Sequence, residues 1–218
     1  MAMKSRRNLT SGLSKIEVLV IVAVASFFIC VTALWLVAGR PRARAICCNC
    51  NLKQIGLGMR VWASDHNGNN PMQISVTNGG TRELISAGQV FSTFQVMSNE
   101  LSTPFVLVCP GDRTRLPATN FTSDFGEDKL SYFIGADATN DMVQAFLSGD
   151  RNLTINGSHL GHGIHAFTTN QSIGWTGEFH GDRGNIALGD GSVMILSSKD
   201  LNEFLANTGL PTNRLAIP

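Results

Sequence analysis

The sequence predicts an α+β fold in which one long N-terminal helix precedes a small antiparallel sheet. Three observations predict this class: an apolar run at residues 18–38, a helical spacing of apolar residues after it, and short apolar stretches separated by Gly, Asp and Asn. The chain has 218 residues, of which 43% are hydrophobic and 15% charged. This composition excludes a disordered chain and allows one membrane segment plus one modest globular domain.

The apolar run is long enough to cross a membrane. It holds 21 residues, with Ser26 and Thr32 as its only polar side chains, and at about 1.5 Å per residue it spans the roughly 30 Å hydrocarbon layer. A cleaved secretory signal is the alternative, because Ala43-Arg44-Ala45 fits a small-x-small cleavage site. The run exceeds the roughly 7–15 residues of a signal's apolar region, and arginines crowd that site. We therefore favour a membrane span.

Charge alone does not orient this span. Basic residues lie on both sides of it in nearly equal number, so the positive-inside rule is almost balanced. Those before the span are Lys4, Arg6, Arg7 and Lys15, and those after it are Arg40, Arg42, Arg44 and Lys53.

Beyond the span the pattern becomes amphipathic. Apolar residues follow one another at steps of four, three, four and three, which predicts a helix with one face on a core; they are Cys48, Leu52, Ile55, Met59 and Trp62. Gly39 and Pro41 predict a kink or interruption of this helix at the membrane surface. The turn-forming residues 65–71 end it.

Short elements fill the remaining chain. Residues 81–101 are expected to hold one or two short helices, and residues 105–108, 131–134 and 144–147 to form strands. Ser197 or Ser198 can cap a final helix that runs through Ala206, with Gly209 just beyond it.

Asp190-Gly191 predicts a two-residue β-hairpin. The dipeptide suits a type I′ turn, which needs positive φ at both central positions. Such a turn would pair Leu188 with Val193 and Ile186 with Ile195, so that the apolar residues of both strands share one face.

Glu17 is the most informative single residue. A carboxylate at the edge of the hydrocarbon layer costs about 2–4 kcal/mol by insertion scales, so it is expected to serve a function and to need a cationic partner. Two opposite charges at low dielectric attract strongly when both are present and close.

The segment Gly12-Leu13-Ser14-Lys15-Ile16-Glu17 resembles the cleavage and methylation site of type IV prepilins and type II secretion pseudopilins. The resemblance implies that prepilin peptidase cuts after Gly12 and that the new amino group of Leu13 is methylated. It also implies that Glu17 pairs with this amine on a neighbouring subunit as a fibre grows. The chain departs from the family at residues 13–15, where Phe or Met followed by Thr-Leu is usual. Lys15 lies close enough to Glu17 in sequence to neutralise it within one chain.

A second signature is His180 followed by nine residues and then Asp190-Gly191, which resembles the prepilin-associated H-x9-D-G domain. Further segments also match this family: Cys48 with residues 51–56, residues 109–112 and residues 131–133. The resemblance implies a pilin-like layout and no enzymatic activity. Its expected parts are a leader peptide at 1–12, a transmembrane helix at 13–39, an amphipathic continuation at 40–66 and a globular head at 67–218.

The resemblance also implies a location and partners. The chain would cross the bacterial inner membrane once, with its leader in the cytoplasm and its head in the periplasm, and would enter a periplasmic or surface fibre. Prepilin peptidase, other pilin-like subunits, an inner-membrane assembly platform and membrane lipid are the expected partners. Removing residues 1–12 takes away three basic residues and leaves 14 Lys and Arg against 16 Asp and Glu, a formal charge of −2. Without a basic cluster, no nucleic-acid partner is expected.

His180 and Asp190 can be interpreted as a catalytic pair or as structural residues. An imidazole and a carboxylate are the usual parts of a general base, but no nucleophile stands in a recognisable motif. We expect a structural role, in which His180 hydrogen-bonds near the Asp190 turn and ties one loop to the hairpin.

No metal site is assigned from the sequence. His159, His162 and His165 recur every three residues, yet the glycines among them disfavour a helix and an extended strand would scatter the rings. Calcium is the one cofactor left open, with oxygens offered by Asp137, Asp182 and Asp190, although each of these residues also suits a turn.

The cysteines fit an exported head. Cys30 lies in the span, and the other four would face an oxidising periplasm. The first disulfide candidate joins Cys48 to Cys109, with Cys50 as a competitor.

A non-polymerising protein is the competing class. It would be a membrane-anchored or secreted domain that binds a ligand or carries an unrecognised activity. Five Asn-x-Ser/Thr sequons, at Asn8, Asn120, Asn152, Asn156 and Asn170, are compatible with a glycosylated exported domain. A passive anchor should tolerate replacement of Glu17, whereas an assembling pilin should not.

Overall fold

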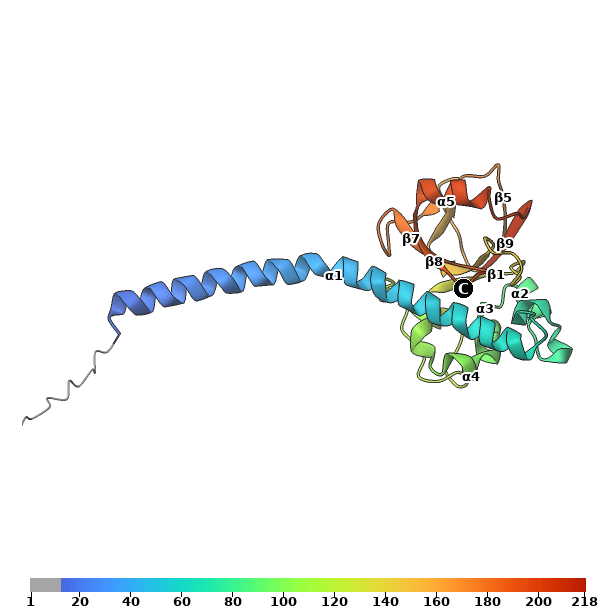
Figure 1. Cartoon of the computed structure of the whole chain (residues 1–218), viewed down its shortest axis with the longest axis horizontal. Coiled ribbons are helices and arrows are strands. Elements are labelled where there is room, and N and C mark those ends of the chain that lie inside the picture. Colours follow the sequence, from blue (N-terminus) through green and yellow to red (C-terminus); the bar gives the residue numbers. More distant parts are fainter. Residues whose placement is uncertain (1–12) are drawn as a thin grey trace, which may run out of the picture. The chain divides into compact units, whose positions relative to one another are not determined.

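The computed structural model describes residues 13–218, without the side chains of residues 37–42. It contains a long N-terminal helix and two antiparallel sheets, so the predicted α+β class is confirmed (Figure 1). The chain divides into two compact units, with the boundary between Arg40 and Pro41.

Helix α1, Lys15–Asp65, begins with a reciprocal cap. The backbone N–H of Ser14 donates to Glu17 Oε2 at 2.7 Å, and the backbone N–H of Glu17 donates to Ser14 Oγ at 3.3 Å. This is the capping-box arrangement, which satisfies two backbone donors that a helix start leaves unpaired.

Helix α1 is not interrupted at Gly39 and Pro41, because it continues as a single 51-residue helix, whereas the alternative of a kink there stays a prediction. A proline removes one helical hydrogen bond. Ala38, Arg40, Arg42 and Ala43 are good helix formers, so the helix continues through Gly39 and Pro41.

The first unit carries an apolar helical segment. Lys15–Leu36 is the segment of the described chain that is long and apolar enough to cross a membrane, and none of it is buried. Thr32 is satisfied within the helix, because its hydroxyl donates to the carbonyls of Phe28 at 2.9 Å and Ile29 at 3.0 Å. A single N-terminal membrane anchor is consistent with these features.

The second unit is built on a six-stranded sheet with the order β5-β9-β1-β2-β7-β8. Its strands are β1 Tyr132–Gly135, β2 Phe146–Asp150, β5 Gly163–Thr168, β7 Arg183–Leu188, β8 Val193–Ser197 and β9 Thr212–Ile217. A smaller sheet has the order β4-β3-β6, from Ser158–His159, Leu153–Ile155 and Ile173–Trp175. All paired strands are antiparallel.

Short helices complete this unit. The α-helices are α2 Arg82–Ser86, α3 Val90–Val96, α4 Ser98–Leu101 and α5 Ser198–Leu205, and the 3-10 turns are η1 Pro71–Gln73, η2 Val76–Asn78, η3 Pro104–Leu107 and η4 Glu127–Lys129. Residues 81–101 therefore hold three helices rather than one or two. The predicted final helix is confirmed, since Ser197 caps α5 in a capping box with Asp200.

The strand predictions have mixed outcomes. The strand at 131–134 is confirmed by β1, and the strand at 144–147 begins two residues later as β2. The strand at 105–108 is wrong, because this segment forms η3. Pro104 at the first turn and the bond from Phe105 N–H to Thr103 Oγ1 at 3.4 Å favour a helical turn there.

Two apolar cores lie on opposite faces of the large sheet. Along β1, Tyr132 and Ile134 belong to one core and Phe133 to the other, as the two-residue period of a strand requires. The first core contains the α1 stripe predicted from the sequence: Cys48, Leu52, Ile55, Met59 and Trp62. The second core contains Leu201 and Leu205 of α5 together with residues of the small sheet.

The Asp190-Gly191 hairpin exists, but its turn type and register differ from the prediction. Asp190 keeps a negative φ and only Gly191 is left-handed, with φ +78°. Leu188 accepts from Gly191 N–H at 2.8 Å and donates to Ser192 O at 2.9 Å. The loop therefore has three residues and ends in a glycine bulge.

This extra loop residue shifts the pairing by one. Ala187 lies opposite Val193, Ile186 opposite Met194 and Asn185 opposite Ile195. Because side chains alternate along a strand, Ile195 points to the face opposite Ile186.

The hairpin turn packs against α1. A Cβ at Gly56 would lie 3.7 Å from Gly191 Cα, and a Cβ at Gly191 would lie 2.8 Å from Arg60 Cζ. Glycine is therefore required at position 191 for two reasons: the backbone has a positive φ, and a Cβ would clash with the Arg60 side chain.

Candidate functional site

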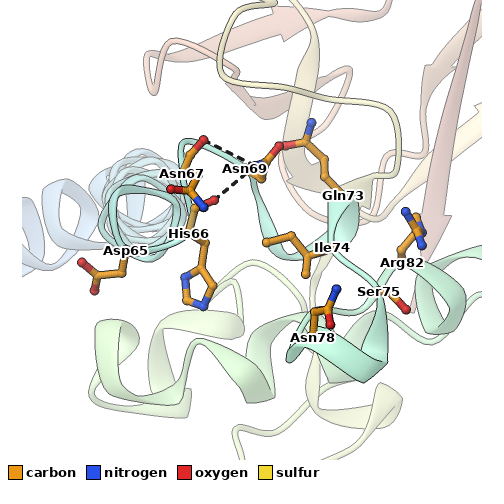
Figure 2. Close-up of a pocket in the computed structure, with 9 residues that line it drawn as sticks. All are labelled: Asp65, His66, Asn67, Asn69, Gln73, Ile74, Ser75, Asn78 and Arg82. Carbon is orange, nitrogen blue, oxygen red and sulfur yellow. Dashed lines mark hydrogen bonds between the residues drawn. The ribbon is translucent and has the colours of Figure 1, made fainter.

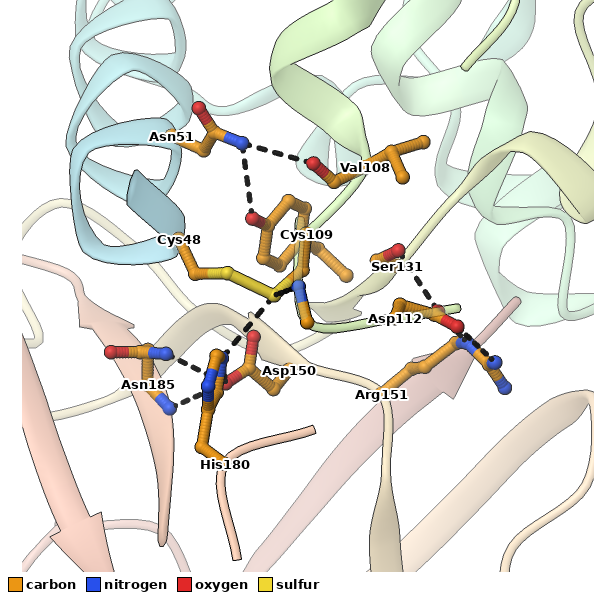
Figure 3. The surroundings of a disulfide bond; sticks show 12 residues. Cys48, Asn51, Val108, Cys109, Asp112, Ser131, Asp150, Arg151, His180 and Asn185 are labelled. Atoms are coloured by element: carbon orange, nitrogen blue, oxygen red, sulfur yellow. Dashed lines mark hydrogen bonds and ion pairs between the residues drawn. A yellow bond between two sulfur atoms is a disulfide. The ribbon is translucent and has the colours of Figure 1, made fainter. Parts of the chain in front are cut away.

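Several segments singled out in the sequence meet around one disulfide in the second unit (Figure 3). Cys48 of α1 is bonded to Cys109, which follows η3, and both residues are fully buried. This is the pair that the sequence placed first. The competitor Cys50 is free and exposed.

His180 lies against this disulfide. Its Nε2 is 3.2 Å from Cys109 Sγ and 3.8 Å from Asp150 Oδ2, and only 5% of its side chain is exposed. Gly111 makes room for the ring, because a Cβ at Gly111 would lie 2.8 Å from His180 Cε1. Burial lowers the pKa of His180 and favours its neutral form.

The expected bond between His180 and the Asp190 turn is wrong. Asp190 Oδ1 instead accepts from Ser192 N–H at 2.8 Å. The six-residue strand β7 separates the two motif residues. At about 3.3 Å per residue such a strand holds its two ends roughly 20 Å apart, so His180 and Asp190 serve different contacts.

Asp150 is the most unusual carboxylate of the site. It is fully buried in β2, and Asn185 donates to its Oδ2 from both the backbone N–H and Nδ2 at 2.8 Å. Its Oδ1 has no hydrogen-bond partner among residues 13–218. Burial raises the pKa of Asp150 to about 7, against the opposing effect of the Asn185 bonds. The contact with His180 is therefore not a strong ion pair, since both pKa shifts favour the uncharged forms.

A second buried carboxylate, Asp112, forms a bidentate ion pair. Arg151 donates from Nε to Asp112 Oδ2 at 2.9 Å and from Nη2 to Oδ1 at 3.2 Å. Ser131 Oγ donates to the same carboxylate at 2.9 Å. Burial acts to raise the pKa of Asp112, but the bonds from Arg151 and Thr114 outweigh it and lower this pKa. The Arg151 guanidinium also lies over the Phe179 ring, 5.4 Å from its centroid.

Asn51 ties helix α1 to the same region. Its Nδ2 donates to Val108 O at 3.0 Å and to Tyr132 Oη at 3.3 Å. Burial raises the pKa of Tyr132 well above its usual value, so its phenol stays protonated. These bonds hold the disulfide region to β1.

A pocket of about 300 Å³ opens beside His180. Its walls are mainly apolar, and it is lined by Ala45, Ile46, His180, Arg183, Asn185 and Ile195. Small solutes can therefore approach His180 from this side.

A second pocket, of about 420 Å³, lies at the C-terminal end of α1 (Figure 2). Its lining residues are Asp65, His66, Asn67, Asn69, Gln73, Ile74, Ser75, Asn78 and Arg82. His66 stacks on Trp62 with ring centroids 3.5 Å apart and contacts Trp62 O through Nδ1 at 2.7 Å. This histidine is held by its own helix.

The structure does not gather the histidines considered as metal ligands. His162 Nδ1 contacts Ile217 O at 3.1 Å, and His165 Nε2 contacts Gly161 O at 2.9 Å. His159 instead lies 4.0 Å from Glu178. Each ring thus has its own separate neighbour.

The aspartates considered for calcium also have separate partners. Asp137 pairs with Arg214, Asp182 accepts from Ser198, and Asp190 accepts from Ser192. Within residues 13–218, the group of three potential metal-ligating side chains that the fold does bring together is Cys48, Cys109 and His180.

Sequence analysis missed Asp150, Arg151 and Asn185. The only local signal was the Asp-Arg pair at positions 150–151, where β2 ends, and Asn185 stands in no motif. Their importance arises from strand pairing, which places Gly149 opposite Ile186 and so brings Asp150 close to Asn185.

Of the residues assigned to processing and assembly, Leu13 lies two residues before α1, Glu17 lies in the first turn of α1, and Gly12 lies outside the described residues. Neither a scan of protein-family models nor searches of curated proteins and solved structures finds a match to this chain.

Proposed function

We propose that this chain is a pseudopilin, a structural subunit assembled into a type II secretion-like or type IV pilus-like fibre. The observation that carries the proposal is the construction of α1. One helix begins at a capped carboxylate, continues through an exposed apolar segment of membrane length, and supplies the buried Cys48–Trp62 stripe of the second unit. This arrangement suits a subunit that passes from a membrane into a helical bundle.

The capping bond of the Glu17 carboxylate does not require its negative charge. Within residues 13–218 this carboxylate accepts the bond from Ser14 N–H at 2.7 Å. A glutamine at the third helical position would serve a capping box equally well. The negative charge therefore remains for another group, and the amino group of Leu13 on a neighbouring subunit, formed by a cut after Gly12, has the required charge.

The proposal gives the remaining parts consistent roles. Prepilin peptidase would process the chain, an inner-membrane platform would assemble it, and lipid would surround α1 before assembly. The disulfide-bonded second unit would lie in the periplasm, an oxidising compartment. Its function would be surface contact within the fibre rather than turnover.

The first test is the identity of the mature N-terminus. Mass spectrometry of the terminal peptide of the membrane-extracted protein should find methylated Leu13. An N-terminus after Ala45 would mean a secreted domain, and an intact Met1 would mean a plain membrane anchor. Either result would overturn the pilin pathway.

The second test separates the charge of Glu17 from its cap. Glu17→Gln keeps the capping box and removes the charge, whereas Ser14→Ala removes the cap and keeps the charge. In cells that carry the assembly machinery, Glu17→Gln should reduce the fibre fraction by roughly tenfold or more, equivalent to about 1.4 kcal/mol. Ser14→Ala should assemble nearly as the natural chain does. Equal assembly of Glu17→Gln and the natural chain would favour a passive anchor that binds ligand or carries another activity.

A further inference from the structure

The disulfide site contains the donor set of a zinc centre. Cys48 Sγ, Cys109 Sγ and His180 Nε2 all lie within 4.8 Å of one another. They come from α1, the segment after η3, and the turn before β7. Two thiolates and one imidazole are ligands that Zn²⁺ commonly takes, and they need only a fourth donor to complete a tetrahedron.

Asp150 lies beside this group of three without belonging to it, and a shift of its side chain would bring an oxygen to the fourth position. Its Oδ2 lies 3.8 Å from His180 Nε2 and is held by two bonds from Asn185. The other oxygen, Oδ1, is buried and has no hydrogen-bond partner in the described part of the chain, and Figure 3 shows it pointing toward the disulfide. A buried carboxylate oxygen without a donor is costly, and a cation would satisfy it.

We propose that the reduced chain binds one Zn²⁺ ion through Cys48, Cys109 and His180, with Asp150 supplying the fourth ligand. The disulfide and the zinc centre are then alternative states of one site. The site is independent of fibre assembly, so the proposal goes beyond the proposed function and does not rest on it.

The exchange between the two states balances with a dithiol as reductant. The dithiol gives two electrons and two protons, the Cys48–Cys109 bond breaks into two thiols, and the dithiol becomes a disulfide. Zn²⁺ then binds both sulfurs as thiolates, and the two thiol protons go to solvent. His180 contributes the lone pair of Nε2.

The surroundings suit this exchange. Gly111 N–H donates to Cys109 Sγ at 3.3 Å, a contact that would also stabilise a thiolate. Asn185 orients the Asp150 carboxylate, as outer partners orient metal ligands elsewhere. The pocket of about 300 Å³ reaches His180 and gives an ion a way in.

The test uses the full chain in detergent with Cys30, Cys47 and Cys50 replaced by serine, so that only Cys48 and Cys109 remain. The protein is reduced under anaerobic conditions and titrated with Zn²⁺, and with Co²⁺ as a spectroscopic probe. We expect one ion per reduced chain, thiolate-to-cobalt charge-transfer bands, and no binding by the oxidised chain. Bound Zn²⁺ should also protect Cys48 and Cys109 from alkylation.

His180→Gln and Asp150→Asn should each weaken Zn²⁺ binding by roughly tenfold or more. His162→Gln is the matched control, because this ring contacts a backbone carbonyl outside the site and should leave affinity unchanged. Reduction that unfolds the chain, followed by refolding when Zn²⁺ is added, would also support the proposal. A reduced chain that takes up no more Zn²⁺ than the oxidised one, or that stays unfolded with Zn²⁺, would overturn it. Equal losses in His180→Gln and His162→Gln would do so as well.

Discussion

Asp112 and Asp150 are both buried beside one disulfide, yet they differ in what surrounds their charge. Asp112 receives a two-point bond from Arg151 and further bonds from Ser131 and Thr114. Asp150 accepts from the neutral donors of Asn185 on one oxygen, and its other oxygen has no donor among the residues that the structure describes. Correspondingly, the pKa of Asp112 is lowered and that of Asp150 is raised.

This difference separates a structural carboxylate from a functional candidate. A buried charge with a bidentate partner has recovered much of its lost hydration. A buried carboxylate without a cation has not, and such groups concentrate at functional sites. Replacing each carboxylate by its neutral amide should therefore change stability in opposite directions at neutral pH.

The largest effect is expected for Asp112→Asn. This exchange leaves the Arg151 guanidinium, whose side chain is 11% exposed, without its counter-charge. Breaking a buried pair from one side costs about 3–5 kcal/mol. Thermal unfolding of the full chain in detergent, followed by circular dichroism, measures this loss.

The double variant Asp112→Leu/Arg151→Met is the control. It removes both charges and should recover much of the lost stability, because apolar residues often replace a buried ion pair at little cost. If Asp112→Asn unfolds at the same temperature as the natural chain, the pair contributes nothing and the contrast with Asp150 fails.

Removal of the Cys48–Cys109 disulfide should give the second-largest loss of stability. It closes a loop between residues 61 positions apart, and loss of a disulfide commonly costs about 2–4 kcal/mol. Cys48→Ala/Cys109→Ala should lower the unfolding temperature accordingly. Cys47→Ala/Cys50→Ala removes two exposed free thiols and should not. Equal effects of the two double variants would mean that Cys48 and Cys109 are not paired in the protein.

Asp150→Asn should show the opposite sign to Asp112→Asn at neutral pH. The folded carboxyl has its pKa raised to about 7, above an unfolded value near 3.9. The folded state thus binds the proton more tightly, and its stability falls as pH rises from about 4 through 7. The Asp150→Asn chain keeps an acceptor for Asn185 and should lack this fall.

At pH 8 the Asp150→Asn chain should therefore be more stable than the natural chain, by on the order of 1–3 kcal/mol. Denaturant unfolding of the oxidised proteins at pH 5 and pH 8 measures the difference. Asp112 and His180 lie close to Asp150 and both have lowered pKa values, so Asp112→Asn and His180→Gln serve as comparison curves. A natural chain whose stability does not fall between these pH values would contradict the assignment.

The sequence could predict what depends on local pattern. The stripe from Cys48 to Trp62 is buried because a helical period needs no knowledge of the partner. The cap at Ser197 was likewise visible, because it depends on residues four positions apart at most. The pairing of Cys48 with Cys109 was only the first candidate, with Cys50 as a competitor, because spatial closeness cannot be deduced from the sequence.

What the sequence could not predict depends on distant partners. Asp150 and Asn185 meet only because β2 pairs with β7 in one register. Residues 105–108 are apolar enough to suggest a strand. With Pro104 in its first turn, however, this segment forms a 3-10 turn. The predicted register of the hairpin was wrong by one residue, because Asp-Gly also fits a three-residue loop.

Asp190 is a half-buried carboxylate outside the disulfide site, and its replacement should give the smallest effect. Its Oδ1 accepts from Ser192 N–H at 2.8 Å, and an asparagine oxygen can accept the same bond. Asp190→Asn should therefore shift stability by no more than about 0.5 kcal/mol. Gly191→Ala should cost about 1 kcal/mol or more, because its φ of +78° and the nearby Arg60 side chain both oppose a Cβ.

Asp190→Ala distinguishes the two turn types. In the observed loop Asp190 has a negative φ, so alanine loses only the bond to Ser192 and should cost less than Gly191→Ala. In a type I′ turn both central residues need positive φ, and alanine would be penalised at position 190 as well. Unfolding temperatures of the three variants therefore decide the loop: similar losses for Asp190→Ala and Gly191→Ala would restore the two-residue turn, and with it the register that pairs Leu188 with Val193.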